Sequence, residues 1–218
     1  MDEVARAESE RGELVLRRRP DGTLELRANG VFVMDTVETS TERALATRAL
    51  ELHARPATVL VGGLGLGFTL RAVLEDGRVE RVTVVEIEEA LPGWMRDGTV
   101  PGSDLLADPR VTVTVGDVAQ VLAVSAGSTY DLVLLDVDNG PGYLVHDANA
   151  DLYEAAALEQ ARRATRPGGT VVVWSAAQAP GLGATMERVF GRWRSEAVAY
   201  DVDLQGRAET YWLYVGHV

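Results

Sequence analysis

Beyond residue 56, short apolar runs alternate with stretches that have helical spacing. The runs are rich in Val and Leu and occupy 57–62, 81–86, 110–115, 130–136 and 169–174. The helical stretches lie between them and beyond them, at about 66–76, 88–96, 117–124, 151–165 and 180–193. Two further strands are expected at about 195–203 and 208–216. Nearly continuous apolar strands are typical of sheets covered on both faces. The pattern therefore predicts an α/β fold with a doubly wound, mostly parallel sheet of about seven strands.

The first forty residues follow a different pattern. Residues 1–12 are polar, and we expect them to be frayed. Short apolar runs follow around two turn signals, at 14–16, 24–26 and 31–34, and a helix is expected over 40–54. We therefore predict a short antiparallel β element over 1–39, followed by a Rossmann-like cofactor-binding and catalytic domain over 40–218.

Net charge and composition limit the classes of partner that we expect the protein to bind. The 218 residues carry a net charge of −12, which repels phosphate backbones and attracts cations. This argues against nucleic acid and is compatible with a cationic substrate such as an amine. The chain has no cysteine, and no apolar run reaches the roughly 18 residues that span a bilayer. We expect a cytoplasmic protein with no membrane partner, and we see no clustered ligand spacing that predicts a metal.

A glycine-rich loop is the first candidate site. Gly62, Gly63, Gly65 and Gly67 follow one predicted strand and open a helix. Glycine lets the backbone approach a ligand closely, and the helix N-terminus presents free N–H groups. Glu86 ends the next strand, about 20 residues further on, where an acid can accept both hydroxyls of a ribose. This spacing predicts a nucleotide-type cofactor but does not separate a dinucleotide from S-adenosylmethionine.

Further acids end the next two predicted strands. Asp117 lies at the carboxyl edge of the sheet, where it either contacts a ligand or only caps the following helix. Asp136, Asp138 and Asn139 end the fourth strand before a Gly/Pro loop, and we expect them over the same crevice as the glycine loop. Carboxylates there can hold a cationic substrate and deprotonate an amine. His146 lies beyond, as a candidate base on the substrate loop.

Together these segments resemble the spermidine synthase (polyamine aminopropyltransferase) family, which has a class I methyltransferase-like fold. The resemblance runs from about Leu24 to Trp174. It rests on Asn29-Gly30-Val31, Gly62-Gly63, Thr69-Leu70-Arg71, Val73-Leu74, Val84-Val85-Glu86-Ile87, Asp108-Pro109-Arg110-Val111, Gly116-Asp117, Tyr130-Asp131 through Asp136, Leu152-Tyr153 and Arg166-Pro167-Gly168-Gly169.

The resemblance implies a transferase that moves an aminopropyl group from decarboxylated S-adenosylmethionine to a small cationic amine. It implies Asp136 and Asp138 as catalytic acids, and Asn139 and His146 on the substrate loop. The implied cofactor-binding residues are Gly63, Gly65, Gly67, Glu86, Ile87, Asp117 and Val118. A homodimer is compatible with this interpretation.

The chain also departs from the family pattern: its glycine loop is one residue longer, its N-terminal β element is short, and three sets of side chains differ. The family's glycine loop carries an acid for the amino end of the cofactor, where this loop has Leu64, Gly65 and Leu66. Thr41, Glu42 and Arg43 fall near the position of the family's Tyr-His pair, and Asn139 stands where the family has its second loop acid. Three alternatives therefore stay open: an S-adenosylmethionine-dependent methyltransferase, a non-catalytic nucleoside-binding relative, and an NAD-type enzyme.

Overall fold

The computed structural model describes residues 1–204 and 207–218. A seven-stranded sheet forms its centre, with strand order β10-β11-β9-β8-β5-β6-β7. The bounds are β5 (Thr58–Gly62), β6 (Arg81–Glu86), β7 (Val111–Val115), β8 (Tyr130–Leu135), β9 (Thr165–Ser175), β10 (Ser195–Leu204) and β11 (Arg207–His217). The strands from β9 to β7 run parallel, and β11 pairs antiparallel with both β9 and β10. The predicted α/β fold with a mostly parallel seven-stranded sheet is confirmed.

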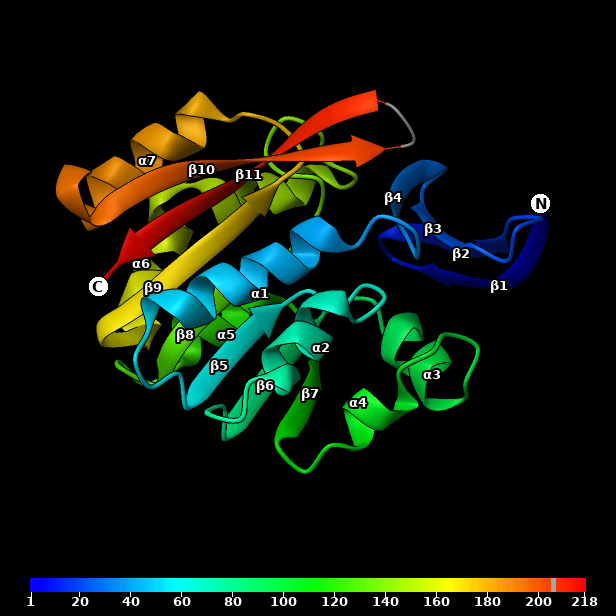
Figure 1. The fold of residues 1–218 in the computed structure, drawn as a ribbon, viewed down its shortest axis with the longest axis horizontal. Coiled ribbons are helices and arrows are strands. Elements are labelled where there is room, and N and C mark those ends of the chain that lie inside the picture. The colour runs from blue at the N-terminus through cyan, green and yellow to red at the C-terminus, as the bar shows by residue number, and fades with distance from the viewer. Residues whose placement is uncertain (205–206) are drawn as a thin grey trace.

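Helices cover both faces of this sheet (Figure 1). They are α1 (Ser40–Leu52), α2 (Phe68–Glu75), α3 (Ala90–Arg96), α4 (Ser103–Ala107), α5 (Val118–Val124), α6 (Ala155–Ala164) and α7 (Pro180–Phe190), with 3₁₀ turns η1 (Asp147–Tyr153) and η2 (Arg192–Arg194). Helices α1 and α2 lie on the near face in Figure 1, and α5 and α6 lie on the far face. No helix in the described part of the chain is long and apolar enough to cross a bilayer.

Burial follows each strand's place in the sheet. Strands β5 and β8, in the middle, are buried at every position, whereas the edge strand β7 is partly exposed throughout. Two apolar clusters result, one on each face, because successive strand residues point to opposite faces. Leu60 and Val133 belong to one cluster, while Val61 and Leu132 belong to the other. The apolar runs in the sequence thus mark the strands that helices cover on both sides.

A second sheet lies beyond the carboxyl ends of the parallel strands (Figure 1). Its four antiparallel strands are β1 (Asp2–Ser9), β2 (Gly12–Arg18), β3 (Leu24–Ala28) and β4 (Val31–Asp35), in that order. Leu16 and Leu26 are fully buried and join the same apolar cluster as α1 and α2. The predicted antiparallel element is confirmed. Strand β4 and α1 flank the expected boundary at residue 39, but the division into two domains stays a prediction.

The expectation that residues 1–12 fray is wrong. Strand β1 pairs with β2 along nearly its whole length, from Asp2 opposite Arg18 to Ser9 opposite Gly12. Arg6 pairs with both Glu3 and Glu13, so charged side chains hold the two strands together. A strand with polar side chains on both faces lacks the alternation that sequence patterns detect. The N-terminal element is therefore longer by one strand than predicted.

Three smaller boundaries also differ from the prediction. Helix α4 falls in a segment where no element was expected, and five residues are too few for a clear helical period. The helix expected over 151–165 is divided between η1 and α6. Strand β9 begins at Thr165 rather than at 169, because Thr165 pairs with Tyr130 ahead of an irregularity in the ladder. The Pro-Gly-Gly segment therefore lies within the strand.

Candidate active site

The glycine loop joins β5 to α2 at the centre of the sheet. Gly63 has φ +95°, and a Cβ built there would lie 2.1 Å from the carbonyl oxygen of Asp136. Gly65 has φ +50° and lies against the sulfur of Met34 from β4. These two positions require glycine because side chains disfavour that backbone region and nothing can give way at the Asp136 carbonyl. The loop is thus pressed between the end of β8 and the N-terminal sheet.

Glu86 lies at the end of β6, next to the glycine loop. Its two carboxylate oxygens accept hydrogen bonds from the backbone N–H groups of Leu64 and Glu88, each at 2.8 Å. Burial raises the pKa of this carboxyl, while the backbone donors oppose the shift. Each carboxylate oxygen can accept a second hydrogen bond, so Glu86 can still receive hydroxyl groups from a ligand.

A cavity borders the glycine loop, which we call the loop cavity. Of the predicted cofactor-binding residues, it is lined by Gly63, Gly65, Glu86, Ile87, Asp117 and Val118. Gly67 is not among its lining residues and instead lies beside Met95 and Leu105 at the start of α2. Leu14 and Leu26 of the N-terminal sheet form the opposite wall. The N-terminal sheet and the part of the chain that contains the seven-stranded sheet therefore both contribute residues to this cavity.

Asp117 caps the helix that follows it, and its position also leaves it open to a ligand. Its carboxylate accepts a hydrogen bond from the backbone N–H of Ala119 at 2.8 Å and so caps α5. The same residue also lines the loop cavity. A carboxylate with one bonded oxygen keeps acceptor sites that a ligand can use.

Asp136 follows directly after β8 and also lines the loop cavity. Burial raises the pKa of Asp136 to about 6; a hydrogen bond from Thr69 opposes the shift and the charge of Glu86 adds to it. The Thr69 hydroxyl lies 2.5 Å from one carboxylate oxygen of Asp136. A carboxyl with a pKa near neutrality can exchange a proton with a bound amine under ordinary conditions.

Asp138 has a different environment from Asp136. Its carboxylate accepts hydrogen bonds from the backbone N–H groups of Asn139 and Val145 at 2.7 Å and of His146 at 3.3 Å. It accepts a fourth from the side-chain amide of Asn149, at 2.7 Å. A carboxylate has about four such acceptor sites, so the loop itself occupies them all. Asp138 lines the loop cavity, but its contacts are those of a residue that shapes the loop.

The two remaining predicted residues lie on opposite sides of this loop. His146 lines the loop cavity, and its Nδ1 is buried with no hydrogen-bond partner among the described residues. Asn139 lines a second cavity instead and donates to the carbonyl oxygen of Phe32 at 3.2 Å. Asp136 and Asp138 thus line the cavity beside the glycine loop, as does His146, whereas Asn139, which was also expected there, lines the other cavity.

We call the second cavity the acidic cavity. Five carboxylates line it, from Asp35, Glu38, Glu42, Asp203 and Glu209. Aromatic side chains form much of the remaining wall, and these are Phe32, Tyr143, Trp174 and Tyr211. Val33 of β4 lines both cavities, so the two spaces adjoin at this residue. Within the described residues, no group of three or more acids and histidines is arranged to hold a metal ion.

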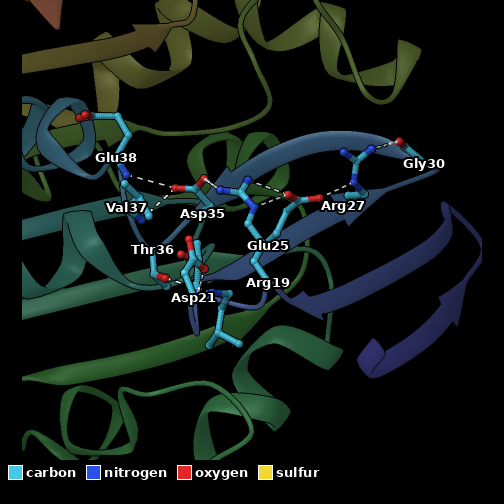
Figure 2. A network of polar contacts seen from close by, with 11 residues as sticks. Arg19, Asp21, Glu25, Arg27, Gly30, Asp35, Thr36, Val37 and Glu38 are labelled. Atoms are coloured by element: carbon cyan, nitrogen blue, oxygen red, sulfur yellow. Dashed lines mark hydrogen bonds and ion pairs between the residues drawn. The ribbon is translucent and has the colours of Figure 1, made fainter. Parts of the chain in front are cut away.

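Two acids of the acidic cavity are held by neighbouring groups (Figure 2). Arg19 lies between Asp35 and Glu25 and pairs with them at 2.9 and 2.6 Å. The other oxygen of Asp35 accepts from the backbone N–H groups of Val37 and Glu38. The carboxylate of Glu38 in turn accepts from the backbone N–H of Ser40 at 2.8 Å. These contacts fix the segment that leads from β4 into α1.

Glu42 is a site residue that sequence reasoning did not select. It lies in the first turn of α1 and is 8% exposed. Burial and the nearby charge of Asp136 raise its pKa to about 7. The Thr69 hydroxyl, bonded to Asp136, also lies 3.3 Å from the carbonyl oxygen of Glu42. The only sequence signal was its place near the segment that departs from the family pattern.

Residues 38–182 match the family model described as the spermine/spermidine synthase domain. Putrescine N-methyltransferase 3 from Nicotiana tabacum is 32% identical over 118 residues, which are 53% of this chain and 29% of that protein. Spermidine synthase 1 from Pisum sativum is 32% identical over 150 residues, or 65% of this chain and 43% of that protein. The matched segments thus span less than half the length of these relatives.

Solved structures support the same fold. A spermidine synthase from Thermotoga maritima superposes with a TM-score of 0.82 at 18% identity, covering 99% of this chain and 72% of that one. A spermidine synthase in complex with the transition-state analogue AdoDATO gives 0.81 at 18% identity, covering 99% and 73%. The matched model spans the glycine loop, Glu86 and the Asp136 loop. The chain therefore belongs to the spermine/spermidine synthase domain family.

Proposed function

We propose that this protein transfers an aminopropyl group from decarboxylated S-adenosylmethionine to a small cationic amine. The observation that carries the proposal is Asp136, a buried carboxyl with a pKa of about 6 between the glycine loop and Thr69. It lies at the carboxyl end of the central strands, where ligands bind in open α/β sheets. Family membership and the names of the relatives support the same reaction class.

The two cavities suggest how the reactants are placed. The nucleoside occupies the loop cavity, where Glu86 receives ribose hydroxyls and Asp117 receives a donor from the base. His146, whose Nδ1 has no partner within the described chain, provides a further polar contact there. The amine enters through the acidic cavity, whose carboxylates attract cations. No metal is expected to take part.

The chemistry needs little from the protein beyond placement and proton removal. The amine arrives as an ammonium and loses one proton to Asp136, and its lone pair then attacks the carbon beside the sulfonium. The N–C bond forms as the C–S bond breaks, and the electron pair of that bond neutralises the sulfur. Because the sulfonium is already a good leaving group, orientation and electrostatics supply most of the rate enhancement.

A product assay tests the proposal. We expect methylthioadenosine when the protein is incubated with decarboxylated S-adenosylmethionine and putrescine, measured by chromatography. Asp136→Asn should lower kcat by about 10²- to 10⁴-fold, because the amine loses its base. Asp147→Asn is the matched control, since Asp147 is exposed. A wild-type protein that binds neither nucleoside in calorimetry would overturn the proposal.

Methyl transfer to the amine is the second candidate. The glycine loop offers no acid to the amino end of a cofactor, because Leu64 and Leu66 occupy it and are buried. Putrescine N-methyltransferases are among the relatives. Release of S-adenosylhomocysteine from S-adenosylmethionine, without methylthioadenosine from the decarboxylated form, would select this alternative. A homodimer and a cytoplasmic location stay predictions.

A further inference from the structure

Glu42 is a buried acid near Asp136 that the proposed reaction has not yet used. It lines the acidic cavity and is 8% exposed, yet no arginine in the described chain forms an ion pair with it. Asp35, in the same cavity, is paired with Arg19, and Glu38 is bonded to Ser40. The side-chain partner of Glu42 is the hydroxyl of Thr41, at 2.9 Å. The charged form of a buried acid without a cation is costly, and a cationic ligand can offset that cost.

The second acid expected from the catalytic loop cannot fill this role. All four acceptor sites of Asp138 are taken by the loop, and Asn139 carries no charge. Glu42 reaches the same region from a different element, the first turn of α1. Thr69 links Asp136 to the backbone of α1, because its hydroxyl lies 2.5 Å from the Asp136 carboxylate and 3.3 Å from the main-chain carbonyl oxygen of Glu42. The Asp136 charge also acts on the Glu42 carboxyl and raises its pKa.

We propose that Glu42 is the second carboxylate for the acceptor amine, and that it holds the reacting ammonium in the acidic cavity while Asp136 faces the same nitrogen from the loop cavity. The inference rests on the proposed function. The ammonium gives one proton to this pair of carboxylates, and the freed lone pair forms the N–C bond as the C–S bond breaks. The sulfur leaves as a neutral thioether, and the product amine keeps its remaining protons.

The surroundings of the pair predict how amine binding responds to pH. Around Glu42 lie Glu38 on the preceding segment, Asp136 beyond β8 and Tyr211 on β11, while Glu86 acts on Asp136. Arg19 also lines the acidic cavity, but it is paired with Asp35, and no cation of the described residues forms an ion pair with Glu42 or Asp136. Because Glu42 has a pKa of about 7, amine binding should weaken as the pH falls below that value.

Calorimetry measures the contribution of Glu42 to amine binding in the absence of the reaction. Putrescine and spermidine are titrated into the full chain saturated with methylthioadenosine, at pH 6 and pH 8.5. We expect Glu42→Gln to weaken amine binding at pH 8.5 by about tenfold or more, with the Kd for methylthioadenosine unchanged. The variant should also show a smaller difference between the two pH values, because only Asp136 of the pair still titrates between them. Glu51→Gln, an exposed acid on the same helix, serves as the control.

The possible outcomes distinguish the assignment of Glu42 from the proposed reaction. Amine binding that depends on Glu42 without any turnover supports this assignment and contradicts the proposed reaction. Turnover with amine affinity and pH response unchanged in Glu42→Gln overturns the assignment and leaves the reaction standing. A wild-type protein that binds neither amine overturns the assignment as well. Circular dichroism of each variant confirms that the fold is intact before binding is compared.

Discussion

At the scale of single residues, the site depends on carboxyls whose charged forms are disfavoured by burial. Burial raises the pKa of Glu42 to about 7 and that of Asp136 to about 6, from ordinary values of 4.5 and 3.8. An acid whose pKa is raised in the folded state binds its proton more tightly there. It therefore stabilises the fold below its ordinary pKa, and this contribution is lost as the pH rises through the raised value.

This sign predicts that stability falls as the pH rises towards neutrality, and that substituting Glu42 removes part of the loss. The free energy of unfolding of the wild type should fall between about pH 5 and pH 8, by up to about 3 kcal/mol from Glu42. Glu42→Gln should flatten this part of the profile and be more stable than the wild type at pH 8. Urea denaturation followed by circular dichroism measures both. A variant whose profile parallels the wild type would contradict the buried-acid description.

At the scale of elements, the segment after β8 is shaped by one carboxylate. Asp138 has φ +63°, and its oxygens gather the backbone of Asn139, Val145 and His146 together with the Asn149 amide. The Tyr153 hydroxyl also donates to the carbonyl oxygen of Val137 at 2.5 Å. The segment is thus held by these polar bonds in addition to the packing of Val137 and Leu144 against the apolar cluster.

Asp138→Asn should therefore loosen this segment while leaving the core intact. An amide oxygen accepts fewer and weaker hydrogen bonds than a carboxylate, so we expect faster amide exchange over 139–149. Methylthioadenosine should bind about tenfold more weakly, since the segment lines the loop cavity. Hydrogen exchange with mass spectrometry and calorimetry measure the two effects. Asp147→Asn, on the exposed side, should match the wild type in both.

At the scale of the whole molecule, the site lies between the two sheets. Arg11, in the turn between β1 and β2, donates to the Asn149 side chain at 2.9 Å and pairs with Glu88 at 3.4 Å. It also lines the loop cavity, as do Leu14 and Leu26. The N-terminal sheet thus closes the cavity whose floor is the edge of the main sheet.

Removing the Arg11 side chain should affect the rate of ligand release more than the stability of the fold. Arg11→Ala leaves the buried leucines in place but deletes the two polar contacts that Arg11 makes, with Asn149 and Glu88. We expect methylthioadenosine to dissociate several-fold faster, with the free energy of unfolding lowered by no more than about 1 kcal/mol. Stopped-flow displacement and urea denaturation provide the measurements. Arg18→Ala, an exposed neighbour on β2, is the control, and an equal change in both variants would refute the role of Arg11.

Much of the main sheet and part of the site could be predicted from local patterns. Apolar runs mark β5 and β8 because those strands are buried on both faces. Gly63, Glu86 and Asp136 were recognisable because each ends a strand at the carboxyl edge, where residues far apart in sequence converge. Strand β1 was missed, since its polar side chains leave no hydrophobic period, and α4 is too short to show one.

The sequence by itself determined the fold class, the glycine loop and the acids at the strand ends, because hydrophobic period and turn chemistry are local properties. Only the tertiary structure decided which of these acids keep acceptor sites free for a ligand. It saturates Asp138 with hydrogen bonds from its own loop, sends Asn139 to the acidic cavity, and brings Glu42 from α1 beside Asp136. Burial and pairing depend on what other segments place around a side chain, and these neighbours are set by packing between elements.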